Sequence, residues 1–359
     1  MVGAVNSPHL DDLAEAVEER GHEVFIAGYA SEGQPPSRDT GGRTTVLPMP
    51  PPRPGAGVLV ARQLRDVARR VRPDVVHAHA FSGPTLAATL ARLRPLVVTA
   101  WGSDIYRATG YARFANRWIA RRAQAFTADS SDLLEALVRL GAPRQRTELI
   151  RYGVDLKALA PAQDRAEVRD RLGLGPGRVI LSPRALRPLY NVDVIVEAFN
   201  RLADEDPSVG LVVKYLGADR PAFLDALDGG RVHVVGPVPY ERLIDYYRAA
   251  DVCVSIPDTD SSPRSVWEAM ACGCPCVLSD LPWVTELIEP GKHALVVRPE
   301  PGEVADAVRS ILTDDALARS LSSAGRRLVE DHHDRDAEMD RLESLYREVA
   351  DGLRATSRT

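Results

Sequence analysis

The stretch at residues 251–291 constrains the fold more than any other part of this 359-residue chain. Asp251 to Ile256 is a short apolar run rich in β-branched residues, which predicts a buried strand. Ser262 is a good N-cap, Pro263 suits the first position of a helix, and Gly273 suits the end of that helix. A second apolar run follows. This order predicts a parallel α/β sheet, a class that binds anionic ligands where a helix begins after a strand.

Two acids stand out in this stretch. Asp260 lies in the predicted loop before the helix, and Glu268 lies inside the helix. Arg264 precedes Glu268 by four residues, so both side chains are predicted to share one helix face. The sequence therefore places a carboxylate, a cation and a further carboxylate around the start of one helix.

The sequence EAMACGCPCV from Glu268 resembles the donor-sugar motif of the family 4 retaining glycosyltransferases. Glu286 stands where the family has a later glutamate, and Asp260 stands where it has an earlier one. The resemblance implies an α/β protein of the GT-B fold, with two Rossmann-like doubly wound domains facing across a cleft. It implies an acceptor-binding domain over 1–158, a nucleotide-sugar-binding domain over 159–335, and a C-terminal helix over 336–359 that crosses back to the first domain.

The resemblance also implies roles for donor-site residues. Glu268 would bind the ribose hydroxyls, Asp260 would approach the donor sugar, and Arg184 would hold the diphosphate, which makes Asp260 and Arg184 the candidate catalytic residues. The family's lysine near Tyr190 is absent, and Arg187 is a candidate replacement. The other donor-binding candidates are Asn191, Val238, Ser261, Ser262, Arg264, Ser265 and Val266.

The acceptor-side candidates lie in the first domain. Asn6 and His9 follow the first predicted strand, and Trp101 and Asp104 lie in the turn after a later one. Trp101 replaces a histidine of the family; it is a candidate to stack on an acceptor sugar, with a core aromatic as the alternative. Asp104 is a candidate acid or base. Elsewhere in this domain, the alternation of His77 with His79 in a predicted strand places both rings on one side.

Charge is divided unevenly along the chain. Residues 1–157 carry 21 basic and 16 acidic side chains, and the remainder carries 24 and 34, within a net charge of −5. Between residues 106 and 126, one predicted helical stripe is basic, with an aromatic stripe of Phe114 and Trp118 beside it; its arginines are Arg113, Arg117 and Arg121. This pattern is typical either of a helix that docks on anionic lipid or of a surface helix whose aromatic side is buried.

No apolar run reaches the ~20 residues of a membrane span, and no signal peptide opens the chain. We therefore expect a cytoplasmic protein, membrane-peripheral if the arginine stripe docks. The four cysteines are expected to be buried structural residues. Asp258 and Asp260 also form a D-x-D pattern, which binds metal in the other large glycosyltransferase fold, but the matching Glu268 favours a metal-free site. We expect no metal, no cofactor beyond the nucleotide-sugar co-substrate, and no nucleic acid partner.

These observations predict a metal-independent retaining hexosyltransferase. It would move a sugar from a UDP- or GDP-sugar to a glycan, lipid-linked or natural-product acceptor. The transition state would be oxocarbenium-like, with charge growing on the departing diphosphate. The alternative is a GT-B protein that no longer transfers sugar and acts as a partner or activator; the absent lysine, the absent histidine and Asp260 favour it, whereas Glu268 and Arg184 oppose it.

Overall fold

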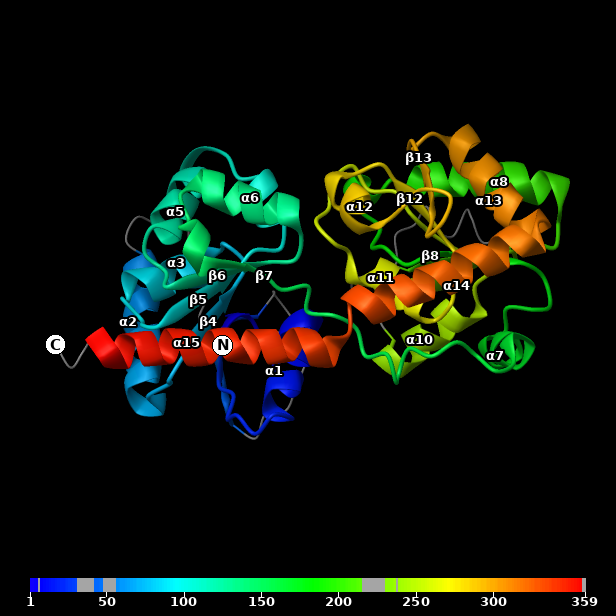
Figure 1. The fold of residues 1–359 in the computed structure, drawn as a ribbon. Coiled ribbons are helices and arrows are strands. Elements are labelled where there is room, and N and C mark those ends of the chain that lie inside the picture. The colour runs from blue at the N-terminus through cyan, green and yellow to red at the C-terminus, as the bar shows by residue number, and fades with distance from the viewer. Residues whose placement is uncertain (6, 31–41, 48–55, 215–229, 237, 357–359) are drawn as a thin grey trace. The chain divides into compact units, whose positions relative to one another are not determined.

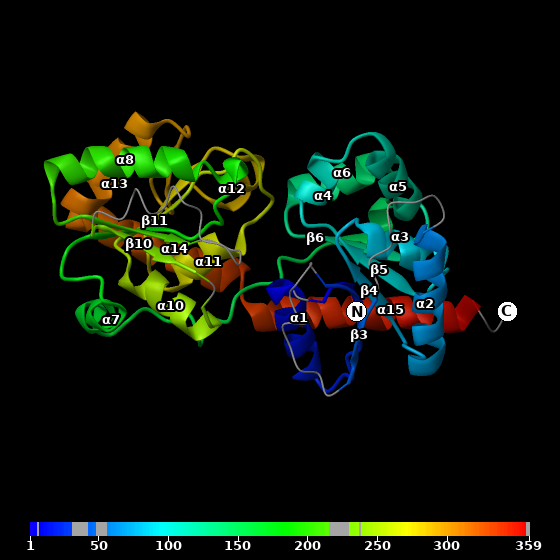
Figure 2. The same cartoon turned by 180° about the vertical axis from the view of Figure 1, so that it is seen from behind.

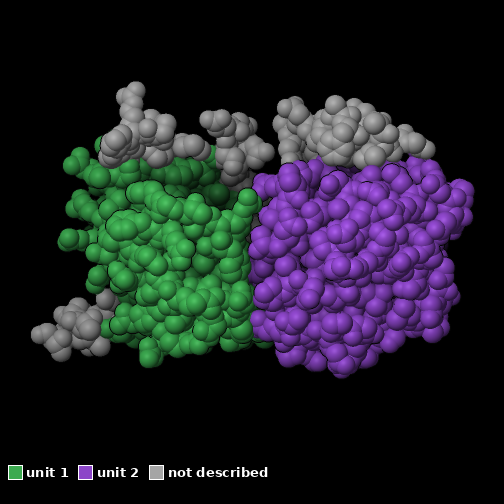
Figure 3. All heavy atoms as spheres, turned by 90° about the horizontal axis from the view of Figure 1, so that it is seen from above, with its two compact units in different colours: residues 1–152, 337–359 green, residues 153–336 purple. Residues whose placement is uncertain are grey.

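The computed structural model describes residues 1–5, 7–30, 42–47, 56–214, 230–236 and 238–356. The chain divides into two compact units, which Figure 3 distinguishes by colour. Unit 1 comprises Met1–Tyr152 and Ala337–Thr359, and unit 2 comprises Gly153–Asp336. No helix built from the described residues has the length and apolarity that a bilayer span requires.

Unit 1 contains, within its described residues, a seven-stranded sheet in which every neighbouring pair is parallel. The spatial order is β3-β2-β1-β4-β5-β6-β7, so the direction of winding reverses between β1 and β4. The strands are β1 (Val2–Ala4), β2 (Ile26–Tyr29), β3 (Thr44–Val46), β4 (Val76–His79), β5 (Leu96–Thr99), β6 (Ala125–Ala128) and β7 (Thr147–Leu149).

Helices cover both faces of this sheet (Figures 1 and 2). They are α1 (Pro8–Glu18), α2 (Ala56–Val71), α3 (Gly83–Leu90), α4 (Ser103–Tyr106), α5 (Gly110–Ala120), α6 (Ser131–Leu140), the 3-10 turn η1 (Arg144–Arg146) and α15 (Arg335–Thr356). Met339, Leu342 and Leu345 of α15 are buried in one core cluster with Leu10 and Leu13 of α1. The C-terminal helix therefore returns to the first unit, as the sequence predicted.

Unit 2 contains a six-stranded parallel sheet within its described residues, in the order β10-β9-β8-β11-β12-β13. The winding reverses between β8 and β11. The strands are β8 (Val179–Ser182), β9 (Gly210–Lys214), β10 (Val232–Val235), β11 (Val252–Ser255), β12 (Cys276–Ser279) and β13 (Leu295–Val297). The two doubly wound sheets confirm the predicted fold class.

Two core clusters lie on opposite faces of this second sheet. Alternate strand residues divide between them: Val212 belongs to one cluster, and Leu211 and Val213 belong to the other. The helices are α7 (Arg165–Leu172), η2 (Pro188–Tyr190), α8 (Val192–Glu205), α10 (Tyr240–Ala249), α11 (Arg264–Ala271), α12 (Pro282–Leu287), α13 (Pro301–Thr313) and α14 (Asp315–His332). Residues of α10 and α11 join the cluster of Val212, whereas residues of α8 and α13 join the other.

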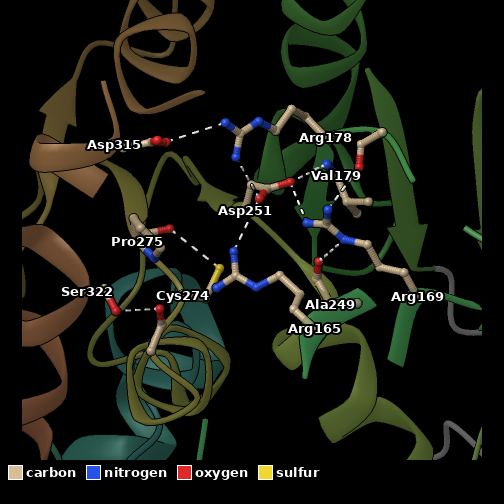
Figure 4. Close-up of polar contacts among 12 residues, drawn as sticks. Arg165, Arg169, Arg178, Val179, Ala249, Asp251, Cys274, Pro275, Asp315 and Ser322 are labelled. Carbon is tan, nitrogen blue, oxygen red and sulfur yellow. Dashed lines mark hydrogen bonds and ion pairs between the residues drawn. The ribbon is translucent and has the colours of Figure 1, made fainter. Parts of the chain in front are cut away.

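Asp251 organises the end of the sheet where β8 and β11 begin (Figure 4). Its buried carboxylate accepts hydrogen bonds from the Val179 amide at 2.7 Å, from Arg169 at 2.5 Å and from Arg165 at 3.2 Å, with Arg178 Nη1 at 3.4 Å. A buried carboxylate needs such partners, because desolvation of an unpaired charge costs several kcal/mol. This dense ion cluster lies at the amino ends of the strands, away from the carboxyl ends where parallel sheets bind ligands.

Candidate active site

The predicted donor residues converge where the winding of unit 2 reverses. Arg184 follows β8 by two residues, and Asp260 lies in the loop between β11 and α11. Parallel sheets bind ligands at this point, because the loops leaving two neighbouring strands diverge there. The sheet order therefore brings together residues that lie 76 positions apart in the sequence.

Arg184 and Asp260 form an ion pair. Arg184 Nη2 donates a hydrogen bond to Asp260 Oδ2 at 2.7 Å, and Nη1 lies 3.3 Å from Ser265 Oγ. The guanidinium also stacks over the Tyr190 ring at 4.2 Å. Burial raises the pKa of Asp260, while Arg184 and the Ser261 amide act in the opposite direction. In this arrangement Asp260 is the ion-pair partner of Arg184, the cation that was predicted to hold the diphosphate.

Glu268 is buried, with 5% of the residue exposed, and its carboxylate accepts hydrogen bonds from three side chains. Tyr240 donates to Oε1 at 2.7 Å, Tyr247 donates to Oε2 at 2.9 Å, and Arg264 Nε donates to Oε1 at 3.0 Å. The contact with Arg264 confirms the predicted sharing of one helix face. The same carboxylate raises the pKa of both tyrosines, second to burial. Each phenol therefore stays protonated and keeps donating to Glu268.

Lys214 is a cation of this region that the sequence analysis missed. It ends β9, whose residue Val213 pairs with Ser182 of β8, so Lys214 lies one strand away from the chain that leads to Arg184. By alternation it shares the sheet face of Val212, the face that carries α11 and Glu268. Burial lowers the pKa of Lys214, nearby Glu268 opposes that shift and nearby Arg184 adds to it. The signal available in the sequence was a lysine at the end of an apolar strand, in a chain with only three lysines.

The loop before α11 differs from the sequence prediction. The helix begins at Arg264 with Pro263 at the N-cap, so Ser262 is not the N-cap and Pro263 is not the first helical residue. Ser262 Oγ instead lies 2.9 Å from the indole Nε1 of Trp267 and accepts its hydrogen bond. The backbone of Ser262 has φ = +149°, a conformation that costs a non-glycine residue of order 1–3 kcal/mol. The Ser262 hydroxyl therefore bonds to a side chain of the helix, and the helix has no side-chain cap at its first residue.

Two backbone amides, one in this loop and one in the first turn of α11, donate to nearby oxygens of the same segment. The Ser261 amide donates to Asp260 Oδ1 at 3.0 Å, and the Val266 amide donates to the Pro263 carbonyl at 2.9 Å. The Val266 side chain is fully buried in the core. Ser261 therefore helps to shape the loop, and Val266 anchors the start of α11 in the core.

The remaining donor candidates lie on both sides of the Arg184–Asp260 pair. Arg187 is exposed. Asn191 has left-handed backbone geometry, with φ = 49°, and its amide donates to Asp258 Oδ1 at 2.7 Å and to the Ile256 carbonyl at 3.0 Å. Asp258 and Asp260 thus bond to different partners. Val238 is half-buried against the core that contains Glu268's helix.

Of the four acceptor-side candidates in unit 1, the structure describes the side chains of Trp101 and Asp104. Asn6 and the side chain of His9 lie outside the described residues. Trp101 is partly buried, with its ring centroid 6.2 Å from that of His79 and 5.2 Å from that of Tyr152. Asp104 accepts the Phe81 amide at 2.7 Å and the Trp101 amide at 3.0 Å. Burial raises the pKa of Asp104 and these amides lower it, so this acid has a structural task in joining two loops.

His77 and His79 do face one side of β4, with ring centroids 4.3 Å apart. His77 contacts the Tyr346 hydroxyl of α15 at 2.5 Å and Thr99 Oγ1 at 2.6 Å. Thr99 in turn bonds to the Tyr152 hydroxyl at 2.5 Å. Burial lowers the pKa of His77 well below its usual value, with a contribution from His79. These contacts tie β4 and β5 to the C-terminal helix.

The cysteines lie in the core of unit 2. All four cysteines are free and buried, and burial raises the pKa of Cys272 to about 12. A protonated thiol is a poor metal ligand. Among the residues that the structure describes, no group of three or more His, Cys, Asp or Glu side chains is arranged to hold a metal ion.

Comparison with known proteins identifies the family. Residues 7–158 match the model "Glycosyltransferase Family 4", and residues 164–328 match "Glycosyl transferases group 1". A D-inositol 3-phosphate glycosyltransferase of Xylanimonas cellulosilytica is 31% identical over 88% of this chain and 85% of its own length. The chain belongs to the family 4 glycosyltransferases. A protein of the same name from Nocardia farcinica is 32% identical over 72% of this chain. That match spans 64% of the Nocardia protein, and a Geodermatophilus obscurus relative is matched over 56% of its length.

Solved structures of this glycosyltransferase class share the fold. Sucrose-phosphate synthase from Thermosynechococcus elongatus superposes with a TM-score of 0.79 at 21% identity, covering 95% of this chain and 92% of that one. Anabaena HepE, solved in complex with UDP and glucose, gives a TM-score of 0.78 at 19% identity over 99% of both chains. At identities this low, the similarity shows that this family member has the GT-B fold. Its substrates have to be inferred from the residues of its own site.

Proposed function

We propose that this family 4 protein is a retaining glycosyltransferase that takes a hexose from a UDP- or GDP-sugar held by unit 2. The observation that supports this most is the meeting of Arg184, Lys214 and buried Glu268 around the carboxyl ends of β8, β9 and β11. Two cations suit a diphosphate, and a fixed carboxylate suits the paired hydroxyls of a ribose. The site thus has one part for each end of a nucleoside diphosphate.

In this proposal the charged residues of the site have different roles. Arg184 and Lys214 neutralise the diphosphate, on which negative charge grows as the glycosidic bond breaks. Arg184 exchanges its partner Asp260, now at 2.7 Å, for a phosphate oxygen. The released carboxylate then faces the sugar, where it stabilises the positive charge of the oxocarbenium-like transition state. Asp260 thereby serves first as a stand-in for the phosphate and then as an electrostatic partner of the ring.

Retention of configuration is proposed to follow a front-face path. The leaving phosphate takes the proton of the acceptor hydroxyl as that oxygen bonds to the sugar, so no separate base is required. The engagement of both Asp104 oxygens by backbone amides supports this path, because it leaves that acid poorly placed to act as a base.

Relatives suggest which substrates to test first. The names of the curated relatives make D-inositol 3-phosphate the first acceptor, and the HepE structure with UDP-glucose makes that the first donor. Glycan, lipid-linked and natural-product acceptors follow in the panel.

The experiment measures release of nucleoside diphosphate from UDP- and GDP-sugars, with and without acceptor, in EDTA. Turnover of at least one donor, with anomeric configuration retained in the product by NMR, supports the proposal. A strict requirement for one added divalent metal contradicts the metal-free mechanism. Tight binding of a nucleotide by calorimetry without turnover of any pair in the panel favours the non-catalytic partner instead.

A further inference from the structure

Helix α5 presents large aromatic side chains outward. Tyr111 is 76% exposed and Phe114 is 68% exposed, whereas the buried positions of the helix hold Ala115, Asn116, Ile119 and Ala120. The predicted alternative, a surface helix with its aromatic side buried, is therefore wrong for Phe114, whereas Trp118 is half-buried. Two exposed aromatic side chains on one helix are typical of an interaction surface, because burying their apolar area against a partner is energetically favourable.

The same region is almost free of negative charge. Residues 83–122 contain seven arginines and one acid, Asp104, which is engaged by backbone amides. The predicted stripe of Arg113, Arg117 and Arg121 is exposed beside the aromatic residues. Within the part of the chain that the structure describes, none of these seven arginines forms an ion pair, although many arginines of unit 2 do. Among the described residues, no carboxylate is therefore ion-paired with these arginines, which leaves their charge available to an anionic partner.

A pocket continues this surface at the end of α5. Its volume is about 240 Å³, and three arginines and an indole line it together with the end of α3. The polar and aromatic lining residues are Thr89, Arg92, Arg94, Arg122 and Trp118. The Arg122 guanidinium stacks over Trp118 at 4.2 Å. Tyr111, Phe114, Trp118 and Arg122 follow one another at intervals of three or four residues, so they lie along one side of the helix. Its dimensions and charge suit a phosphate group.

We propose that α5 and this arginine pocket form a docking surface for a bilayer of anionic phospholipid. Tyr111 and Phe114 enter the interface between headgroups and acyl chains, the arginine stripe lies against the headgroups, and the pocket receives a lipid phosphate. Aromatic rings prefer that interface, and arginines near an anionic leaflet each contribute about 1 kcal/mol, or roughly fivefold in affinity. An exposed helix face suits a flat bilayer better than a single-stranded nucleic acid, which is bound in a groove.

The test is co-sedimentation of the full chain with vesicles of phosphatidylcholine, with or without phosphatidylglycerol. We expect binding only to the anionic vesicles, and release at 0.5 M NaCl because salt screens the arginines. Arg94→Gln with Arg122→Gln should weaken binding at least tenfold, and Tyr111→Ser with Phe114→Ser should do the same. The matched control is Arg70→Gln with Arg319→Gln, which removes two exposed arginines elsewhere and should change binding less than twofold.

Several outcomes would overturn the proposal. They are equal binding to neutral vesicles, an equal loss in the control, and binding of single-stranded DNA or inorganic phosphate with no binding of vesicles. Thermal melting checks that each variant is folded. The result is independent of the proposed function, because vesicle binding needs no donor and the changed residues lie outside unit 2's donor site. Donor hydrolysis in solution should therefore be unchanged in both test variants.

Discussion

Arg184 Nη2 donates a hydrogen bond to Asp260 Oδ2 at 2.7 Å, and neither side chain is more than 16% exposed. The pair joins the cation proposed for the diphosphate to the acid proposed for the sugar. Removing one member of a buried ion pair changes the electrostatics of the other. Each substitution at this site therefore has to be interpreted through both residues.

Asp260→Asn should lower the turnover number by on the order of 10² or more while raising the Michaelis constant for the donor little. The charge interacts more strongly with an oxocarbenium-like ring than with the neutral sugar, and Arg184 becomes free for the phosphates. Steady-state kinetics on a folded variant checks this. Asp258→Asn is the matched control, since that exposed acid bonds to Asn191; it should stay within a few-fold of wild type. A similar small effect of Asp260→Asn would assign Asp260 to loop structure alone.

Glu268→Gln should weaken binding of UDP or GDP about tenfold or more while unit 2 stays folded. A carboxylate makes charge-assisted bonds to two ribose hydroxyls that an amide reproduces poorly. Tyr247→Phe should have a smaller effect of the same sign, because the phenol holds Oε2 at 2.9 Å. Calorimetry with nucleotides measures both. Unchanged affinity in Glu268→Gln would remove this residue from the donor site.

Lys214→Met should weaken UDP or GDP binding by about tenfold to a hundredfold, as expected for a charged hydrogen bond to phosphate. Affinity for the uncharged nucleoside should change little, because the lost charge faces the diphosphate. Lys292→Met is the control, since Lys292 is exposed and pairs with Glu289 at 2.9 Å. Equal losses for nucleoside and nucleotide would instead indicate that Lys214 supports the fold near Glu268.

Asp251→Asn should destabilise unit 2 by about 3 kcal/mol or more, because it leaves the guanidinium of Arg169, which is 10% exposed, without its carboxylate. Asp315→Asn is a useful comparison: Asp315 is 68% exposed and contacts Arg178 at 3.4 Å, so its loss should cost under 1 kcal/mol. Urea unfolding of both variants measures the difference. Equal effects would mean that the cluster in Figure 4 contributes little.

Acid should destabilise unit 1 through His77. Burial holds the pKa of His77 below its unfolded value near 6.5, so above pH 6.5 both states are neutral and stability is complete. As pH falls below 6.5 the unfolded chain takes up a proton that the folded state does not, which costs up to about 1.4 kcal/mol per pH unit. Calorimetry at pH 7.5 and 5.5 should show a smaller loss for His77→Gln than for wild type. Equal losses would assign the acid sensitivity to other groups.

The sequence by itself determined the features that depend on near neighbours. Apolar runs specified the buried strand at β11, the spacing of four residues specified the contact between Arg264 and Glu268, and the motif from Glu268 specified the family. Alternation placed His77 and His79 on one side of β4. These predictions succeeded because backbone geometry alone fixes which residues share a face over a few positions.

Only the tertiary structure decided which distant residues meet. The sheet order put β9 beside β8, which brought Lys214 near Arg184, and it put Asp260 on Arg184 across 76 positions. Whether Phe114 faced the core or solvent also depended on where α5 packs. Periodicity defines the sides of a helix or strand, but the burial of a side and the charges it meets depend on elements brought together by the fold of the whole unit.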